Sequence, residues 1–276
     1  MALNIKLQLR FLLLLLILTP TLLYAGPPYT TDDPEPVEYH GWEVYLASMS
    51  TYTRGFSLGT LPHLEANYGP LHDVQLATTI PMAFYNTYGM AKNYGPGNIQ
   101  IAIKYRFIHE TKFIPQVAFY PQYNIPVGNL SEGLGNGNAQ YFLPFWVQKS
   151  FGEKWQTYGG GGYWINKGPD NQNWSFFGWQ AQYQVSKNVN IGAEVYYQSS
   201  STVTTVPGLS GSFFNFGSII DLTENSHIVF SAGRSINGGT QFQAYVGYLF
   251  TFSKEKEKSS SFYQGNKMIG RPNING

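Results

Sequence analysis

The chain has 276 residues, 12% of them charged, and a formal net charge of +1. An ordinary soluble domain carries about 25% charged residues, so the charged fraction of this chain is unusually low for a soluble protein. The slightly negative mean hydropathy of −0.22 excludes a helical membrane protein, the absence of cysteine excludes disulfides and thiol chemistry, and the near-neutral charge gives no indication of nucleic-acid binding.

Residues 1–25 are predicted to be a cleavable secretory signal peptide. Lys6 and Arg10 precede an unbroken apolar run from Phe11 to Leu18, and Ala25 comes before a plausible cleavage point. The run is too short for a spanning helix, which needs about 20 residues. The alternative is an N-terminal membrane anchor.

Residues 26–40 form an acidic, proline-rich segment. It holds Asp32, Asp33, Glu35 and Glu38, no lysine or arginine, and prolines at 27, 28, 34 and 36. Four prolines in fifteen residues exclude a central strand or a regular helix. Two interpretations stay open. One is a plug folded into the lumen of a barrel, where the acids meet Lys104 and Arg106, with Asp32 or Asp33 expected near Arg106. The other is a solvated lead-in outside the barrel.

Residues 41–252 are predicted to form twelve antiparallel strands. The clearest stretch is 98–107, in which isoleucines and aromatic residues alternate with Asn98, Gln100, Lys104 and Arg106, and period two is the period of a strand. The predicted strands are 42–52, 58–67, 72–80, 98–107, 113–123, 138–149, 155–166, 174–185, 189–198, 212–222, 227–234 and 240–252.

The connections between these strands alternate in length. Those after even-numbered strands are tight, whereas the long ones, 81–97, 125–137 and 199–211, all follow odd-numbered strands. Outer-membrane barrels have short periplasmic turns and long external loops, with an even number of strands. A soluble β-sandwich has no reason to sort loops in this way, so the sequence predicts an all-β transmembrane barrel.

The charged and amide side chains fall on the less apolar face of the strands, which faces the lumen in a membrane barrel. The residues predicted to line the lumen are Asp73, Gln75, Gln100, Lys104, Arg106, Gln140, Gln180, Gln182, Glu194 and Asp221. Aromatic residues at strand ends (Tyr105, Phe107, Phe113, Trp155, Phe250 and Phe252) are predicted to form a girdle at the periplasmic interface.

The sequence carries no sign of catalysis. A membrane lipase needs a histidine to activate a serine, and none of the five histidines has Ser two residues later. No metal-ligand cluster or cofactor motif occurs. The glycine run 159–162 lies inside a strand, where it marks curvature of the wall or a thin patch for a plug to pack against. Residues 253–276, rich in Lys, Glu, Ser and Asn, are predicted to be a disordered periplasmic tail.

Several stretches resemble one bacterial family. Pro28-Tyr29-Thr30-Thr31-Asp32-Asp33-Pro34, the segment 64–70 and the segment 148–152 are similar to signatures of the meta-pathway of phenol degradation family. The resemblance implies an outer-membrane barrel, often described as a transporter, and traffic of small hydrophobic or aromatic molecules. It implies no catalytic residues.

The sequence therefore predicts an outer-membrane β-barrel of a Gram-negative bacterium, surrounded by outer-membrane lipid. Its expected function is passive passage of small solutes, with no enzymatic activity and no cofactor. A structural or surface-interaction barrel with a filled lumen is the alternative, because twelve strands lie between the small barrels that fill their interior and the large ones that leave a channel. An outer-membrane lipid-modifying enzyme is a minor alternative. The sequence gives no indication of oligomeric state.

Overall fold

The computed structural model describes residues 27–90, 92–203, 209–239 and 241–253. The predicted signal peptide, 1–25, and all but the first residue of the predicted tail, 253–276, lie outside these described residues. Within them, no helix is long and apolar enough to cross a bilayer.

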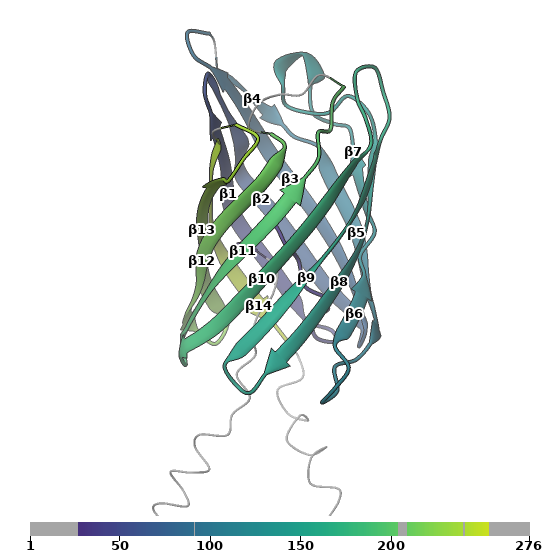
Figure 1. Ribbon diagram of the computed structural model, residues 1–276, viewed down its shortest axis with the longest axis vertical. Coiled ribbons are helices and arrows are strands. Elements are labelled where there is room, and N and C mark those ends of the chain that lie inside the picture. The colour runs from purple at the N-terminus through teal and green to yellow at the C-terminus, as the bar shows by residue number, and fades with distance from the viewer. Residues whose placement is uncertain (1–26, 91, 204–208, 240, 254–276) are drawn as a thin grey trace, which may run out of the picture.

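The described residues form one antiparallel sheet that closes on itself (Figure 1). Its strands are β1 (Trp42–Thr53), β2 (Phe56–Leu71), β3 (Val74–Thr87), β4 (Asn93–Pro96), β5 (Ile99–Ile108), β6 (Gln116–Phe119), β7 (Gln122–Ile125), β8 (Gln140–Phe151), β9 (Trp155–Asn166), β10 (Trp174–Ser186), β11 (Val189–Gln198), β12 (Gly211–Thr223), β13 (Ser226–Ser235) and β14 (Gln241–Phe252). A single 3-10 turn, η1 (Leu130–Glu132), interrupts the connection between β7 and β8.

Fourteen segments make twelve wall strands. β3 pairs with both β4 and β5, so these two are successive parts of one strand. β6 and β7 both lie between β5 and β8 and form another such pair. β1 pairs along its whole length with β14, from Trp42 opposite Phe252 to Thr53 opposite Gln241, and this closes the barrel. The predicted twelve-stranded antiparallel barrel is confirmed.

The two faces of each wall strand differ as the alternation predicts. In β5 the outward Ile101, Ile103 and Tyr105 are 45%, 51% and 52% exposed, while Ala102 and Lys104 between them are buried. The apolar side chains therefore face away from the lumen, which is the arrangement of a membrane barrel. All six aromatic residues of the predicted girdle are exposed.

Loop lengths sort by the end of the barrel. The turns after β2, β8, β10 and β12 span two or three residues, whereas the connections from β7 to β8 and from β11 to β12 are long. Two predicted boundaries are wrong. The expected loop 81–97 is largely a hairpin, because β3 runs on to Thr87 and pairs with β4. The expected strand 113–123 begins only at Gln116 and breaks at 120–121, since Pro121 has no N–H to give to the ladder.

Candidate functional site in the barrel lumen

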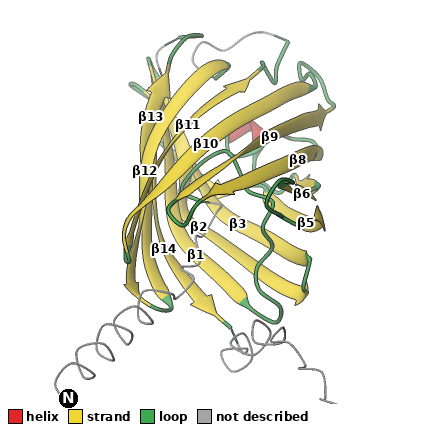
Figure 2. Cartoon of the chain, turned by 60° about the horizontal axis from the view of Figure 1, so that its bottom comes forward, coloured by secondary structure: helices red, strands yellow, loops and turns green. Residues whose placement is uncertain are grey.

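The segment before β1, residues 27–41, contacts inward-facing residues on many strands of the wall. It has no helix or strand of its own and appears as a loop inside the barrel in Figure 2. At its start, the Ser231 hydroxyl of β13 donates a 2.5 Å hydrogen bond to the Pro28 carbonyl. At its end, the His40 N–H donates to the Gly69 carbonyl of β2 at 2.7 Å. We call residues 27–41 the lumen segment.

Residues 29–31 form the tip of the lumen segment. Glu194 of β11 binds this tip through the main-chain N–H groups of Thr30 and Thr31. The Thr30 N–H donates to Glu194 Oε1 at 2.9 Å, and the Thr31 N–H donates to Glu194 Oε2 at 2.8 Å. The Asn215 amide of β12 donates a third bond to Oε1 at 2.6 Å. Glu194 is only 1% exposed. Its carboxylate therefore has little contact with water, and these three donors take the place of hydrogen bonds from water.

Inward-facing glycines make room for the tip. A Cβ atom on Gly178 of β10 would overlap Thr31 Oγ1, and one on Gly192 of β11 would lie 2.6 Å from Tyr29 Oη. A Cβ on Gly217 of β12 would lie 3.1 Å from the Tyr29 ring, after closer contacts with β13. The tip therefore lies directly against the backbone of three neighbouring strands, as glycine permits where chains approach closely.

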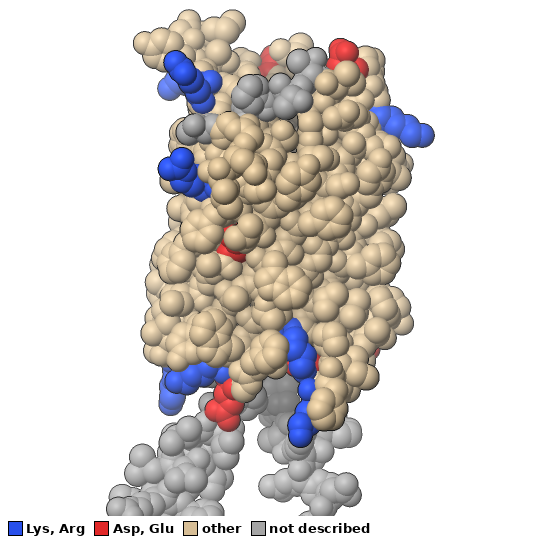
Figure 3. Space-filling view, viewed as in Figure 1, with Lys and Arg blue, Asp and Glu red and all other residues tan. Residues whose placement is uncertain are grey.

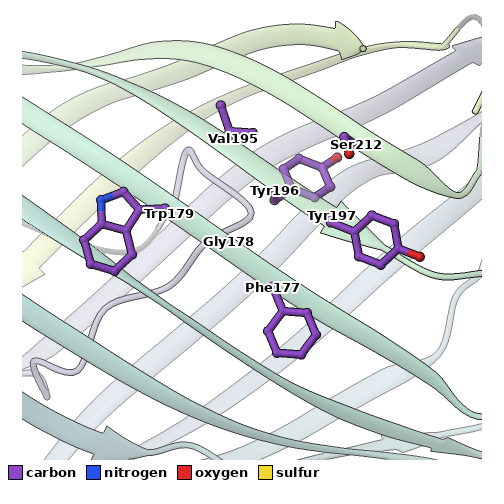
Figure 4. A pocket seen from close by; sticks show the side chains of 7 residues that line it. All are labelled: Phe177, Gly178, Trp179, Val195, Tyr196, Tyr197 and Ser212. Atoms are coloured by element: carbon purple, nitrogen blue, oxygen red, sulfur yellow. The ribbon is translucent and has the colours of Figure 1, made fainter. Parts of the chain in front are cut away.

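The outer side of the wall is hollowed at the same place. A shallow pocket of about 260 Å³ lies over Gly178, between the side chains of β10 and β11 (Figure 4). Its lining includes Phe177, Trp179, Val195 and Tyr197, all of them exposed. The β10–β11 ladder is continuous past this point, so the wall is thin there but not open.

Two cations of β5 bind the acids of the lumen segment. Lys104 Nζ lies 3.1 Å from Asp32 Oδ1 and 3.5 Å from Asp33 Oδ2, and Lys104 and Asp33 are 3% and 1% exposed. Arg106 instead pairs with Glu35 at 3.5 Å and with Asp73, just before β3, at 3.0 Å. The expectation that Asp32 or Asp33 lies near Arg106 is therefore wrong, because Lys104 is deeper in the lumen and takes both.

Residues 35–41, through which the lumen segment leads into β1, are fixed near the short-turn end of the barrel. The Val37 N–H donates to the Gln75 side chain at 3.0 Å, and Lys104 also donates to the Glu35 carbonyl at 3.4 Å. The Glu38 side chain is exposed and makes no ion pair with the described residues. Of the four acids in the segment, three thus meet cations of β5.

The half of the lumen beyond the tip, toward the long loops, is lined by stacked aromatic rings. Phe142, Trp146, Phe176, Tyr196 and Phe213 are all buried, and the partly buried Trp164 and Trp174 pack against them. The ring centroids of Phe176 and Tyr196 lie 5.5 Å apart and those of Tyr196 and Phe213 lie 4.9 Å apart. We call these seven residues the aromatic stack.

A chain of amides connects the aromatic stack to Glu194. The Tyr196 hydroxyl donates to Gln243 Oε1 at 2.8 Å, and Gln243 donates to Asn215 Oδ1 at 2.7 Å. Asn215 in turn donates to Glu194. Gln243 lies on β14 and Asn215 on β12, and they meet across Gly233 of β13, where a Cβ would overlap the Asn215 side chain.

The other residues predicted to line the lumen take separate places. Gln100 donates to Asn124 at 3.1 Å, and Gln140 donates to Asn166 at 2.8 Å near the long-loop end. Gln182 accepts a 2.9 Å hydrogen bond from Asn190, while the neighbouring Gln180 is fully buried. Asp221 Oδ1 lies 2.7 Å from His227 Nδ1 at the short-turn end of the barrel.

Sequence reasoning missed the glycines under the tip and the aromatic stack. The alternation places Gly178, Gly192 and Gly217 at inward positions, and a search for glycines on the lumen face alone would have found them. The glycine run 159–162 of β9, which is more conspicuous in the sequence, has a different role. There, a Cβ on Gly160 or Gly161 would overlap backbone carbonyls of β8 and β10, so this run lets neighbouring strands approach closely.

Charge is distributed as the membrane setting requires. On the face drawn in Figure 3, Lys and Arg gather toward the two ends, and the broad band between them is almost free of charged groups. Among the described residues, no group of three or more His, Asp or Glu side chains could hold a metal ion.

Comparison with protein families matches residues 45–252 to the model described as "Putative MetA-pathway of phenol degradation". The chain belongs to this family. The match covers most of the barrel, and it confirms the resemblance seen in the sequence. No curated protein matches the chain in sequence.

Solved structures show the same fold. An outer-membrane channel from Pseudomonas putida F1 superposes with a TM-score of 0.62 at 14% identity, covering 83% of this chain and 100% of that one. The KdgM porin has a TM-score of 0.52 at 9% identity, covering 76% and 99%. The NanC porin has a TM-score of 0.53 at 8% identity, covering 75% and 98%. The protein thus has the β-barrel fold of these outer-membrane channels and porins.

Proposed function

We propose that the protein is an outer-membrane channel for the passive passage of small solutes, hydrophobic or aromatic compounds in particular, and that the lumen segment closes it. A cleavable leader would deliver it to the outer membrane of a Gram-negative bacterium. The proposal involves no enzymatic step and no cofactor.

The aromatic stack is the observation that carries the solute class. Seven inward-facing rings on β8 to β12 pack together and make the half of the lumen that faces the long loops apolar and aromatic. Aromatic solutes pack on such rings in stacked or edge-on arrangements, worth about 0.5–1.5 kcal/mol beyond the buried area. The description of the family, which refers to phenol degradation, agrees with this class.

The closing role rests on the contacts of the lumen segment. It meets Ser231, Glu194, Lys104, Arg106 and Gln75, which lie on different sides of the barrel, so it crosses the lumen rather than following one wall. Its prolines lower the conformational entropy lost on docking, because φ is already restricted there. A solute could then pass only when the segment moves.

Single-channel conductance in planar bilayers tests whether the barrel is a channel and whether the lumen segment closes it. The unchanged protein should conduct weakly, and deletion of residues 27–40 should raise conductance while the barrel remains folded. Reversal of Lys104 and Arg106 to Glu should repel the segment and have a similar effect. If neither variant conducts more than the unchanged protein, the segment does not close the lumen, and a barrel filled by its own side chains becomes the better description.

A further inference from the structure

We propose that the tip of the lumen segment occupies a ligand site, and that the ligand is an aromatic molecule bearing an ammonium group. This inference rests on the proposed channel function and specifies the ligand of the same lumen. In this site Glu194 binds the ammonium group, and Tyr196 and Phe213 receive the ring.

The first argument is the charge of Glu194. Its carboxylate accepts hydrogen bonds from Thr30, Thr31 and Asn215, yet no Lys, Arg or His among the described residues forms an ion pair with it. Lys104 and Arg106, the cations of β5, face other acids. When the tip leaves, the carboxylate loses two of its three donors, so a ligand that restores those donors is favoured over one that does not.

The second argument is the position of the rings. Tyr196 follows Glu194 by two residues on β11, so both side chains point into the lumen, and the Phe213 ring stacks on Tyr196 at 4.9 Å. The network from Tyr196 through Gln243 and Asn215 to Glu194 fixes the carboxylate relative to the rings. A ligand that contacts both the rings and the Glu194 carboxylate needs a ring at one end and hydrogen-bond donors at the other.

The third argument separates the ligand classes. An ammonium group supplies three donors and the opposite charge, so it replaces both main-chain N–H groups of the tip. A hydroxyl group supplies one donor and no charge. A carboxylate would face Glu194 with like charge, which costs free energy in a site of low dielectric constant.

Calorimetric titration of the full-length protein in detergent tests this with three probes of similar shape: 2-phenylethylamine, 2-phenylethanol and 3-phenylpropionate. The amine should bind at least about tenfold tighter than the alcohol, a difference of about 1.4 kcal/mol, and the carboxylate should bind weakest. In Glu194→Gln this ratio should fall close to one. Because both probes compete with the same tip, the ratio cancels any change in how often the tip is docked.

Two further variants isolate the site. Gly178→Ala adds a Cβ that would overlap Thr31 Oγ1 without touching Glu194, so it should displace the tip and tighten binding of the amine and the alcohol by the same factor. Adding Thr31→Ala removes the overlapping oxygen and should return affinity toward that of the unchanged protein. Glu65→Gln, at a lumen carboxylate that contacts Asn67 rather than the tip, should keep the preference for the amine.

The outcomes are distinct from those of the conductance test. Equal affinity for the amine and the alcohol, or a preference that survives Glu194→Gln, would overturn the ligand assignment even if deletion of the segment raises conductance. No binding of any probe to the unchanged protein and to Gly178→Ala would overturn it as well. Conversely, a preference that depends on Glu194 in a protein that never conducts would retain the site and reject the channel.

Discussion

At the scale of single residues, Lys104 decides whether the lumen segment stays docked. Its Nζ pairs with Asp32 and Asp33, and both Lys104 and Asp33 are almost completely buried. Removing one partner of a buried pair costs about 3–5 kcal/mol when the other partner cannot escape. Here the segment can escape into water, so the loss should appear as undocking rather than as unfolding of the barrel.

We therefore expect Lys104→Gln to expose the segment. The chain has no cysteine, and Thr31 is fully buried while the segment is docked, so Thr31→Cys gives a single reporter for maleimide labelling. In Lys104→Gln the reporter should label at least about tenfold faster, since each 1.4 kcal/mol of lost docking energy changes the population tenfold. Lys104→Arg keeps the charge and should label slowly. Equal rates in all three proteins would mean that this ion pair does not hold the segment.

The pairing of individual acids and bases marks the limit of sequence reasoning at this scale. Four acids without a lysine or arginine, set against two inward bases on one strand, favour the one of the two open interpretations in which the segment and β5 meet. They did not say which acid meets which base, because a chain with prolines at 34 and 36 has no regular period from which to count. Glu194 was predicted to line the lumen, but its bonds to Thr30 and Thr31 involve main-chain N–H groups, which carry no sequence signal.

At the scale of elements, β5 keeps its two faces in different solvents. Ile101 is outward and 45% exposed, and the adjacent Gln100 points inward, where it donates to Asn124. Ile101→Arg should cost about 2–4 kcal/mol, since it puts a charge into lipid near the middle of the wall. Gln100→Arg, the matched control, adds the same charge on the lumen side and should cost much less. Urea titration of protein refolded in vesicles measures both, and the opposite ranking would contradict the orientation of β5.

The glycines of β9 are a second element-scale feature. A Cβ on Gly161 would overlap the Phe176 carbonyl and lie 2.7 Å from the Phe177 ring. The carbonyl belongs to the paired strand and cannot move without loss of ladder hydrogen bonds, so Gly161→Ala should destabilise the barrel by about 1–3 kcal/mol. Tyr163→Phe, on the same face of β9, should change the unfolding midpoint little. A neutral Gly161→Ala would indicate that the wall adapts there.

Strands with strict alternation were predictable, and the irregular ones were not. The periodic pattern of 98–107 predicts β5 to within a residue or two, since one face of this strand is apolar and the other is mostly polar. The sequence favours a loop where the structure has the β3–β4 hairpin, because Pro81, Gly95 and Pro96 are residue types typical of turns. Gly95 and Pro96 are accommodated in the sheet because β4 is short and pairs with β3 through only four residues.

At the scale of the whole molecule, closure of the sheet predicts resistance to detergent. Every wall strand has a partner on both sides, so no open edge is left where SDS or another chain can begin to pair. Unboiled protein should migrate differently from boiled protein in SDS gels, and circular dichroism of the refolded protein should show strand and very little helix. A predominantly helical spectrum would contradict the fold.

Chain order gives the lumen segment a place in time as well as in space. Its contacts of Pro28 with Ser231 and of Thr31 with Glu194 join residues 203 and 163 positions apart, and the neighbouring strand β1, which pairs with β2 on one side, finds its second partner in β14. Contacts between such distant positions form late, because the entropy of closing the loop must be overcome first. The residues made first must therefore wait for the last third of the chain, so the seam of the barrel and its interior are completed in the same stage of assembly.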